Sequence, residues 1–152
     1  MFWLVIAAAV VLDVVSKQLI IATMELGQTI TVIPNVFDLC YIQNHGAAFS
    51  ILQGKTVFLI TATVLMMAGL CVYAMKMKDK IMRLELISIA MIVGGGIGNL
   101  IDRIVLGYVT DFLCIHIIPV FNVADCFITC GCIALVLHLA LCNRDFWKDE
   151  KK

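Results

Sequence analysis

Two aspartates in the second half of the chain are of the right type, and close enough in sequence, for acid–base chemistry. Asp111 lies in the aromatic and β-branched stretch 108–112 (YVTDF), and Asp125 follows Asn122 at the start of a long apolar stretch. Only thirteen residues separate the two acids, so one reversal of the chain could bring their carboxyl groups together. Two carboxyl groups that share a proton can activate water, one acting as base while the other donates to a carbonyl oxygen. Asp111 and Asp125 are therefore the candidate catalytic pair.

Other polar residues that are costly in apolar segments fall near these two acids. Asn99, Asp102 and Arg103 stand at positions i, i+3 and i+4, which places them on one face of a helix. An ionisable residue inside a membrane-spanning helix costs about 2.5–3.5 kcal/mol on insertion scales, so each one requires a partner or a role. We expect the arginine and the asparagine amides to orient a substrate or to stabilise developing charge. Asn122 joins this set, and so does Asn44 if its segment folds over the site.

Asp13 and Lys17 form a second polar pair within an apolar stretch. They stand four residues apart on one predicted helix, with the acid nearer the N-terminus, which is the favoured direction. One interpretation is that the two charges neutralise each other while the lysine extends toward the membrane surface. The other is that the pair braces a functional site near the same end of the helix. The sequence alone leaves both interpretations open.

Other hydrolytic chemistries have weaker support in the sequence. The histidines His45, His116 and His138 do not form an HExxH motif, so we expect no zinc site and no other metal. The few serines lack the Gly-x-Ser-x-Gly pattern of a nucleophile elbow. A cysteine nucleophile remains open only for Cys114 with His116 as its base. Paired aspartates are therefore the favoured arrangement.

The seven cysteines predict packing rather than redox chemistry. Free cysteine behaves as a small hydrophobic residue, and most of the seven lie inside apolar runs, where we expect them to be buried. Two are predicted to lie in loops outside those runs, Cys40 and Cys114. The other five are Cys71, Cys126, Cys130, Cys132 and Cys142.

The composition places these residues in a membrane protein. Apolar residues make up 62% of the 152-residue chain and charged residues 14%, with a mean hydropathy of +1.05. Soluble domains have about 25% charged residues, so this chain cannot cover itself with a polar surface. Crossing a bilayer takes about 20 mostly apolar residues. We predict one membrane-embedded domain over residues 1–152, an all-α protein with four spans at about 2–21, 57–75, 84–104 and 123–142.

Two further features of this arrangement follow from the sequence. Residues 22–56 contain turn signals and β-branched residues, so we expect a small β-rich cap outside the membrane, between the first two spans. Gly94 and Gly98 have the GxxxG spacing that lets membrane helices approach closely. We therefore expect the third span to pack tightly against a neighbouring helix.

Basic residues predict the orientation of the chain. Eight of the eleven lysines and arginines fall on one side, either between the second and third spans or after the fourth. By the positive-inside rule that side is cytoplasmic, and with four spans the N-terminus is cytoplasmic as well. The cap at residues 22–56 and the 105–122 segment then face outward. The eight residues are Lys76, Lys78, Lys80, Arg83, Arg144, Lys148, Lys151 and Lys152.

Five short motifs, in order along the chain, resemble those of the signal peptidase II (lipoprotein signal peptidase) family. Residues 13–17 (DVVSK) resemble its D-x-x-S/T-K element, and residues 44–49 (NHGAAF) resemble N-x-G-x-A-F. Residues 94–103 (GGGIGNLIDR) resemble G-G-x-x-G-N-x-x-D-R. Residues 109–112 (VTDF) and 121–125 (FNVAD) look like the two segments that carry its catalytic aspartates. The resemblance covers nearly the whole chain, although the interval between the acids is short for the family.

The resemblance implies removal of the signal peptide from a diacylglyceryl-modified prolipoprotein, just before the lipidated cysteine. It places this reaction at the outer face of a bacterial cytoplasmic membrane, with prolipoproteins and membrane lipids as partners. It implies a monomer with no cofactor and no nucleic-acid partner. Asp111 and Asp125 would be catalytic, and the positioning or supporting residues would be Asn44, Gly46, Asn99, Asp102, Arg103, Asn122, Asp13 and Lys17.

A small proton-coupled transporter or channel is the alternative interpretation, because intramembrane acids also serve proton relays. A relay requires ionisable groups distributed through the bilayer. Here they are concentrated near one edge, and the opposite half offers only Glu85 and His138. The distribution therefore favours the peptidase.

Overall fold

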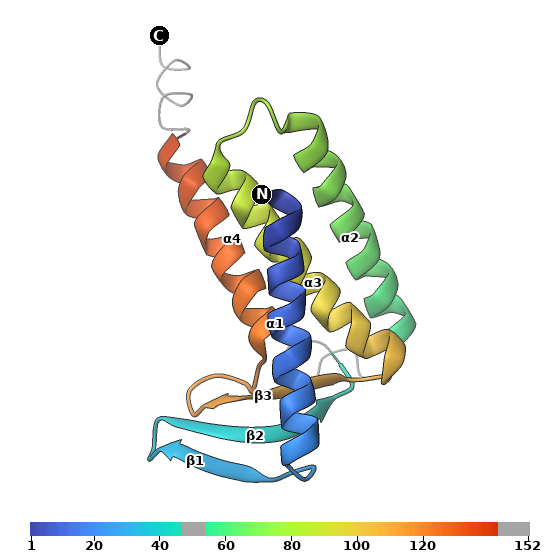
Figure 1. Cartoon of the computed structure of the whole chain (residues 1–152), viewed down its shortest axis with the longest axis vertical. Coiled ribbons are helices and arrows are strands. Elements are labelled where there is room, and N and C mark those ends of the chain that lie inside the picture. Colours follow the sequence, from blue (N-terminus) through green and yellow to red (C-terminus); the bar gives the residue numbers. More distant parts are fainter. Residues whose placement is uncertain (47–53, 143–152) are drawn as a thin grey trace.

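Four long helices and a small sheet make up the computed structural model, which describes residues 1–46 and 54–142. All four helices are long and apolar enough to cross a membrane, as the sequence predicts. Lipid offers no hydrogen-bonding partners to the backbone, so such segments must be helical. The sheet lies at the end of the bundle where α1 ends and α4 begins (Figure 1). The helices are α1 (Phe2–Thr23), α2 (Thr56–Met77), α3 (Arg83–Val105) and α4 (Val123–Cys142).

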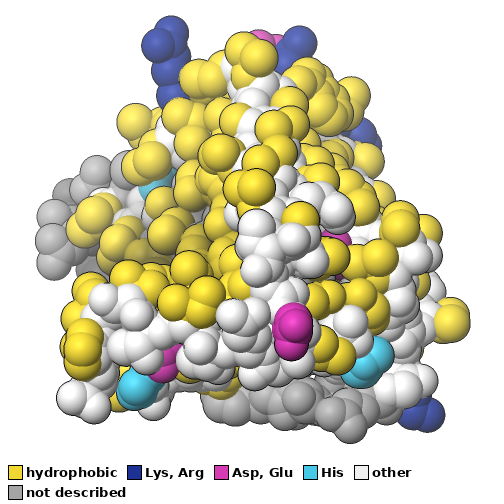
Figure 2. Space-filling view, turned by 60° about the horizontal axis from the view of Figure 1, so that its bottom comes forward, with side chains coloured by type: hydrophobic (Ala, Val, Ile, Leu, Met, Phe, Trp, Pro, Cys, Tyr) yellow, Lys and Arg dark blue, Asp and Glu magenta, His cyan; other side chains and the backbone are white. Residues whose placement is uncertain are grey.

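The helix α3 is the centre of the bundle. Of its most apolar 18-residue window, 61% is buried, against 28% or less in the other three helices. Those three expose hydrophobic side chains over most of their length, and such side chains cover the helical part of the surface (Figure 2). In a bilayer this surface would face lipid. Polar side chains carried by α3 are therefore enclosed by protein. The basic residues Arg144, Lys148, Lys151 and Lys152 lie outside the described residues.

Glycines let α1 and α4 approach α3 closely. A Cβ atom on Gly94 would lie 2.7 Å from the Cβ of Ala9 on α1. A Cβ on Gly95 would overlap the carbonyl oxygen of Ala124 on α4, and one on Gly98 would overlap the Asp13 carboxylate. The close helix approach expected from the GxxxG spacing is therefore present. At Gly98 it has a further effect, since the missing side chain leaves room for a buried acid.

Replacing Gly98 with alanine is expected to destabilise the protein by about 1–3 kcal/mol, the usual cost of an added methylene in a packed interior. Gly69 in α2 is the matched control, because nothing lies within 4 Å of a Cβ built there. Gly69→Ala should be neutral or stabilise by up to about 1 kcal/mol through helix propensity. Unfolding midpoints in detergent would measure both changes. Equal midpoints for the two variants would contradict this account of Gly98.

The sheet contains three antiparallel strands in the order β1–β2–β3. The first two, β1 (Thr29–Ile33) and β2 (Phe37–Asn44), lie in the segment where the sequence predicts strands. The third, β3 (Val109–Ile115), comes from the chain between α3 and α4, so an all-α protein with strands confined to residues 22–56 was an incomplete prediction. The β2–β3 pairing explains the difference, because β3 completes its backbone hydrogen bonds on the edge of β2.

The strand pairing carries the sheet residues of the site to the membrane helices. Asn44 pairs with Val109 and Ile42 pairs with Asp111, after a register shift between Leu39 and Ile42. An apolar cluster fixes the sheet to the end of α1, and it contains Ile20, Met24, Tyr41 and Phe112. The sheet therefore holds Asn44 and Asp111 at a set position above α3 and α4.

The cysteines only partly match their predicted places. Cys40 and Cys114, predicted in loops, lie in β2 and β3, because both segments pair as strands. Cys130 and Cys132 are exposed on α4 rather than buried. Being two residues apart, they lie on nearly opposite sides of the helix, and only Cys130 lines the cavity described below.

Candidate active site

Asp111 is held in a buried position by two side-chain amides. Its carboxylate is 3% exposed. The Asn44 amide donates to Oδ2 over 2.9 Å, and the Asn122 amide donates to Oδ1 over 2.7 Å. Each donor comes from a different element, Asn44 from the end of β2 and Asn122 from the residue before α4. The three elements therefore have to be in place before Asp111 has its hydrogen bonds.

Asp125 and Asn122 cap the start of α4 reciprocally. The Asp125 backbone N–H donates to Asn122 Oδ1 over 3.0 Å, and the Asn122 backbone N–H donates to Asp125 Oδ2 over 3.3 Å. This is the geometry of a capping box, with an asparagine at the N-cap and an acid three residues later. Because the Asn122 amide also donates to Asp111, one fully buried side chain connects the two acids.

Asn99 links the second acid to a buried lysine. Its amide donates to Asp125 Oδ1 over 2.8 Å, and its oxygen accepts from Lys17 Nζ over 2.9 Å and from the Asn122 amide over 3.1 Å. The resulting chain of hydrogen bonds uses both ends of the Asn99 side chain. Lys17 is 1% exposed, so it does not extend to the surface and instead belongs to the site.

Lys17 forms ion pairs with Asp13 and Asp102, and each of these acids also accepts a hydrogen bond from a backbone N–H group. Its ammonium lies 2.8 Å from Asp13 Oδ2 and 3.3 Å from Asp102 Oδ2. Asp13 Oδ1 accepts from the backbone N–H of Ala124 over 2.8 Å, and Asp102 Oδ2 accepts from the backbone N–H of Thr110 over 2.9 Å. Thr110 directly precedes Asp111, and Ala124 directly precedes Asp125. One lysine thus fixes the backbone beside both acids.

That paired anchoring is the part of the site that sequence reasoning missed. The interpretation that Asp13 and Lys17 brace a site did not say which groups they contact. Both acids accept from backbone N–H groups, and every residue except proline has one, so the sequence does not show which of them is contacted. The predicted start of α4 is the exception, because the unpaired N–H groups in the first turn of a helix require acceptors.

Arg103 and Gly46 lie at one margin of the site. The guanidinium donates from Nη2 to the Gly46 carbonyl over 3.2 Å and from Nη1 to the Asn99 carbonyl over 3.3 Å. The Gly46 backbone N–H donates to Asn44 Oδ1 over 3.0 Å. Arg103 therefore ties the end of β2 to α3 without forming an ion pair with either Asp111 or Asp125 among the described residues. Ala47 to Phe49 of the same motif lie outside the described residues.

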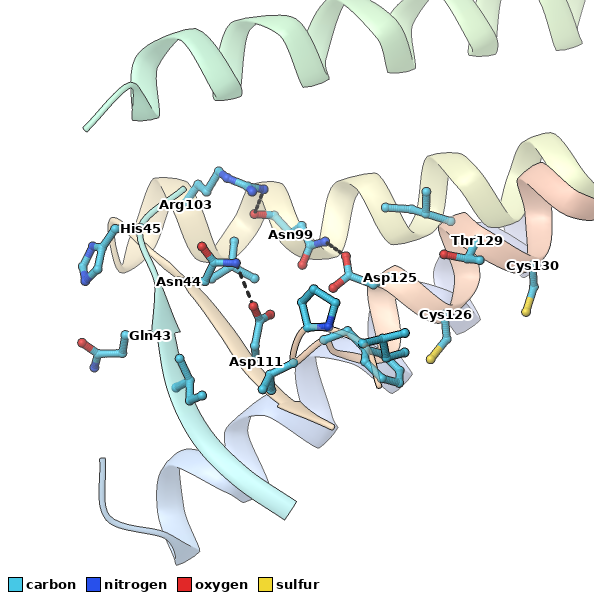
Figure 3. Close-up of a pocket in the computed structure, with 17 residues that line it drawn as sticks. Gln43, Asn44, His45, Asn99, Arg103, Asp111, Asp125, Cys126, Thr129 and Cys130 are labelled. Atoms are coloured by element: carbon cyan, nitrogen blue, oxygen red, sulfur yellow. Dashed lines mark hydrogen bonds between the residues drawn. The ribbon is translucent and has the colours of Figure 1, made fainter. Parts of the chain in front are cut away.

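A cavity of about 680 Å³ opens beside the two acids. Asp111 and Asp125 point toward it from β3 and α4, with Asn44, Asn99 and Arg103 around them (Figure 3). The cavity continues along α4 past Cys126 and Thr129. It joins a polar end at the acids to a wall carried by a membrane-spanning helix, so it can take a ligand with both polar and apolar parts. Cavity residues that the sequence did not indicate include Gln43, His45 and Ile128.

Burial gives Asp111 unusual acid–base properties. It raises the pKa of this carboxyl from 3.8 to about 6, with the negative charge of Asp125 adding to the rise and the hydrogen bonds from Asn44 and Asn122 opposing it. A carboxyl with such a pKa can hold a proton close to neutral pH. The alternative pair, Cys114 and His116, does not line this cavity.

The raised pKa predicts how stability depends on pH. Because the folded state binds the Asp111 proton more tightly than the unfolded chain, stability falls as pH rises from about 4 to about 6, and the loss is complete above that range. A shift of about two pKa units corresponds to about 3 kcal/mol. The measurement is the free energy of unfolding in detergent between pH 4 and 7, for the wild type and Asp111→Asn. The variant should lack this part of the slope, and parallel curves would contradict the prediction.

Four apolar helices, with one buried and one half-buried acid beside a cavity, define a membrane-embedded enzyme. A solved structure described as a bacterial membrane enzyme has the same fold, with a TM-score of 0.89 and 30% identity over 95% of this chain and 90% of its own. A second structure with the same description gives a TM-score of 0.81 and 31% identity over 91% of each chain.

Sequence comparisons give the family. The family model described as signal peptidase (SPase) II matches residues 5–141. The lipoprotein signal peptidase of Halothermothrix orenii is 39% identical, over 99% of this chain and 98% of that relative. The lipoprotein signal peptidase of Streptococcus thermophilus is 43% identical, over 95% of this chain and 91% of that relative. The chain belongs to the signal peptidase II family and is a peptidase, and nothing in these comparisons supports a transporter.

Proposed function

We propose that this protein is an aspartic endopeptidase that removes signal peptides from diacylglyceryl-modified prolipoproteins, cutting just before the lipidated cysteine. The substrate class rests on the relatives, which are named lipoprotein signal peptidases. The aspartic mechanism rests on one observation above all. Asn122 donates to both acids, from its side-chain amide to Asp111 and from its backbone N–H to Asp125, and both acids line the cavity.

The two acids have different environments, which suits them to different roles. Burial favours the protonated form of Asp111 and raises its pKa to about 6. Asp125 lies in the first turn of α4, where the helix dipole and backbone N–H groups favour negative charge. We assign Asp125 as the base that takes a proton from the attacking water, and Asp111 as the acid that protonates the carbonyl oxygen of the scissile bond. When the intermediate collapses, the proton on Asp125 passes to the leaving nitrogen, and Asp111 takes back a proton from one hydroxyl of the intermediate.

The surrounding side chains support this chemistry by position. Asn44, Asn99 and Asn122 fix the carboxyl groups through four hydrogen bonds with N···O distances of 2.7–3.3 Å. Arg103 lies at the margin with its charge close enough to the acids to orient a substrate carbonyl. The apolar wall of the cavity along α4 suits the hydrophobic part of a signal peptide or an acyl chain. No step in this mechanism calls for a metal or a cofactor.

The same proposal places the site in the membrane. The described basic residues Lys76, Lys78, Lys80 and Arg83 lie at the end of the bundle opposite the sheet. With this end in the cytoplasm, the sheet and the two acids lie at the outer face of a bacterial cytoplasmic membrane, and both termini are cytoplasmic. We further propose that the protein works as a monomer among membrane lipids.

Purified protein in detergent, incubated with a diacylglyceryl-modified prolipoprotein, tests the function. We expect loss of the signal peptide, seen as a decrease in mass with a new N-terminus at the lipidated cysteine. The same precursor without the diacylglyceryl group is the matched control and should be cut much more slowly. Equal cleavage of both precursors would refute the lipid requirement. A folded protein that cut neither would refute the proposed function.

A further inference from the structure

A second group of chemically reactive side chains lies on the sheet, away from the two acids. Asp38, Cys114 and His116 each offer one donor atom, and the three atoms lie within 4.8 Å of one another. None of the three lines the cavity beside Asp111 and Asp125. Asp38 lies at the opposite end of β2 from Asn44, so this group is at the far end of the strand from the candidate active site.

The strand register explains why these three side chains meet. Asp38 on β2 is the direct partner of Cys114 on β3, so their side chains lie on the same face of the sheet. His116 follows two residues later and reaches the same face, where its Nε2 lies 2.9 Å from Asp38 Oδ2. Three different donor types therefore converge from two paired strands. Backbone pairing fixes the positions of Asp38 and Cys114, and His116 follows directly after the end of β3.

One atom of this group has no partner. Asp38 Oδ1 is buried and receives no hydrogen bond among the described residues, although the other oxygen of the same carboxylate contacts His116. An unpaired buried carboxylate oxygen is costly, because nothing replaces the water that it loses. A cation bound beside His116 and Cys114 would satisfy this oxygen. The unpaired Asp38 Oδ1 is therefore a second indication of a bound cation, in addition to the three kinds of donor side chain.

We propose that Asp38, Cys114 and His116 bind a zinc ion that fastens β2 to the end of β3. Thiolate, imidazole and carboxylate are the three side-chain donors that zinc accepts. The ion would bind the unpaired Oδ1 of Asp38 together with the His116 imidazole and the Cys114 thiolate. Binding would release the Cys114 proton. His116 is 43% exposed, which leaves an open side for a water as fourth ligand.

Cys40 is a neighbour of this site and not one of its ligands. Its sulfur is not among the three donor atoms that lie within 4.8 Å of one another. Because β2 and β3 also carry Asn44 and Asp111, an ion at this end would stiffen the strand pair that reaches the active site. This inference replaces the expectation from sequence that the chain binds no metal.

Metal titration of the reduced, purified protein tests the proposal. Cobalt(II) serves as the probe, because a cobalt–thiolate bond gives a charge-transfer absorption that zinc then removes by competition. We expect one equivalent of either metal per chain and a higher midpoint of thermal unfolding with zinc. Cys114→Ser should lose the absorption band, and His116→Ala should weaken binding at least tenfold. His116 is exposed, so its replacement leaves the fold intact.

Matched substitutions of the same residue types serve as controls. Cys132→Ser, His45→Ala and Asp79→Asn change exposed residues outside the group and should leave metal binding unchanged. Equal binding by His116→Ala and the wild type would overturn the proposal, as would the absence of any cobalt–thiolate band. A thiol count showing Cys40 and Cys114 joined in a disulfide in the purified protein would overturn it too. None of these readouts depends on peptidase activity, so the proposed function is tested separately.

Discussion

Replacing Asp111 or Asp125 with asparagine should abolish cleavage of the prolipoprotein while leaving the protein folded. An amide has nearly the same shape as a carboxyl group, but it can neither take a proton from water nor give one to the scissile carbonyl. General acid and general base roles each contribute about 10²–10⁴-fold, so either variant should lose at least about 100-fold in kcat. The measurement is the rate of precursor cleavage under saturating substrate, together with substrate binding, which should change little.

The hydrogen bonds of Asp111 make a folding control necessary for this experiment. Asp111 accepts from two amides, and an asparagine there offers a single acceptor oxygen, so one of the two bonds is lost. A folding check is therefore part of the test, and the unfolding midpoint provides it. Asp79→Asn is the matched control, because Asp79 is exposed in the loop between α2 and α3 and should keep full activity. Full activity in either purified Asp111→Asn or Asp125→Asn would refute the assignment of the catalytic pair.

Lys17→Met should destabilise the protein more than Gly98→Ala does. The lysine is almost fully buried and pairs with two acids, Asp13 and Asp102, which lack another cationic partner among the described residues. Removing one member of a buried ion pair leaves uncompensated charge and costs about 3–5 kcal/mol. Chemical denaturation in detergent would measure this loss. Activity should fall as well, because Asp13 and Asp102 hold the backbone beside Asp125 and Asp111, the proposed catalytic pair.

A double variant separates lost charge balance from lost packing. Methionine nearly fills the space of the lysine stem, so adding Asp13→Asn removes one uncompensated charge with little change in volume. The double variant Asp13→Asn, Lys17→Met should therefore recover part of the stability lost by Lys17→Met alone. Lys76→Met, at an exposed position near the end of α2, is the control and should change stability by less than about 0.5 kcal/mol. A Lys17→Met variant as stable as this control would contradict a structural role for the buried ammonium.

The four membrane-spanning helices could be predicted from local sequence, because a bilayer strongly constrains the backbone of an apolar segment. Any segment of about 20 apolar residues must become a helix there, whatever surrounds it. All four spans predicted from composition are present, with ends that differ by no more than two residues. Ionisable residues inside such segments are costly, which is why Asp13, Lys17 and Asp102 stood out before their partners were known. The resemblance to a family was likewise carried by short local motifs.

The pairing of distant segments into a sheet could not be predicted from local sequence. The strand β3 forms only because β2 offers it an edge, and nothing in residues 109–115 distinguishes a strand at that edge from an extended loop. The same pairing brings Asp38, Cys114 and His116 together, although their spacing matches no metal motif. Sequence reasoning therefore treated Cys114 as a loop residue and predicted no metal.

The sequence by itself indicated the membrane environment, the four helices, the family and the two acids proposed as the catalytic pair, because each depends on residue type or on short spacing. Only the tertiary structure decided what each polar group holds. Lys17 reaches Asp102 across 85 positions of the chain, and Asp13 reaches the backbone of Ala124 across 111. Such contacts follow from close helix approach at Gly95 and Gly98, where a side chain of any size would keep the helices apart.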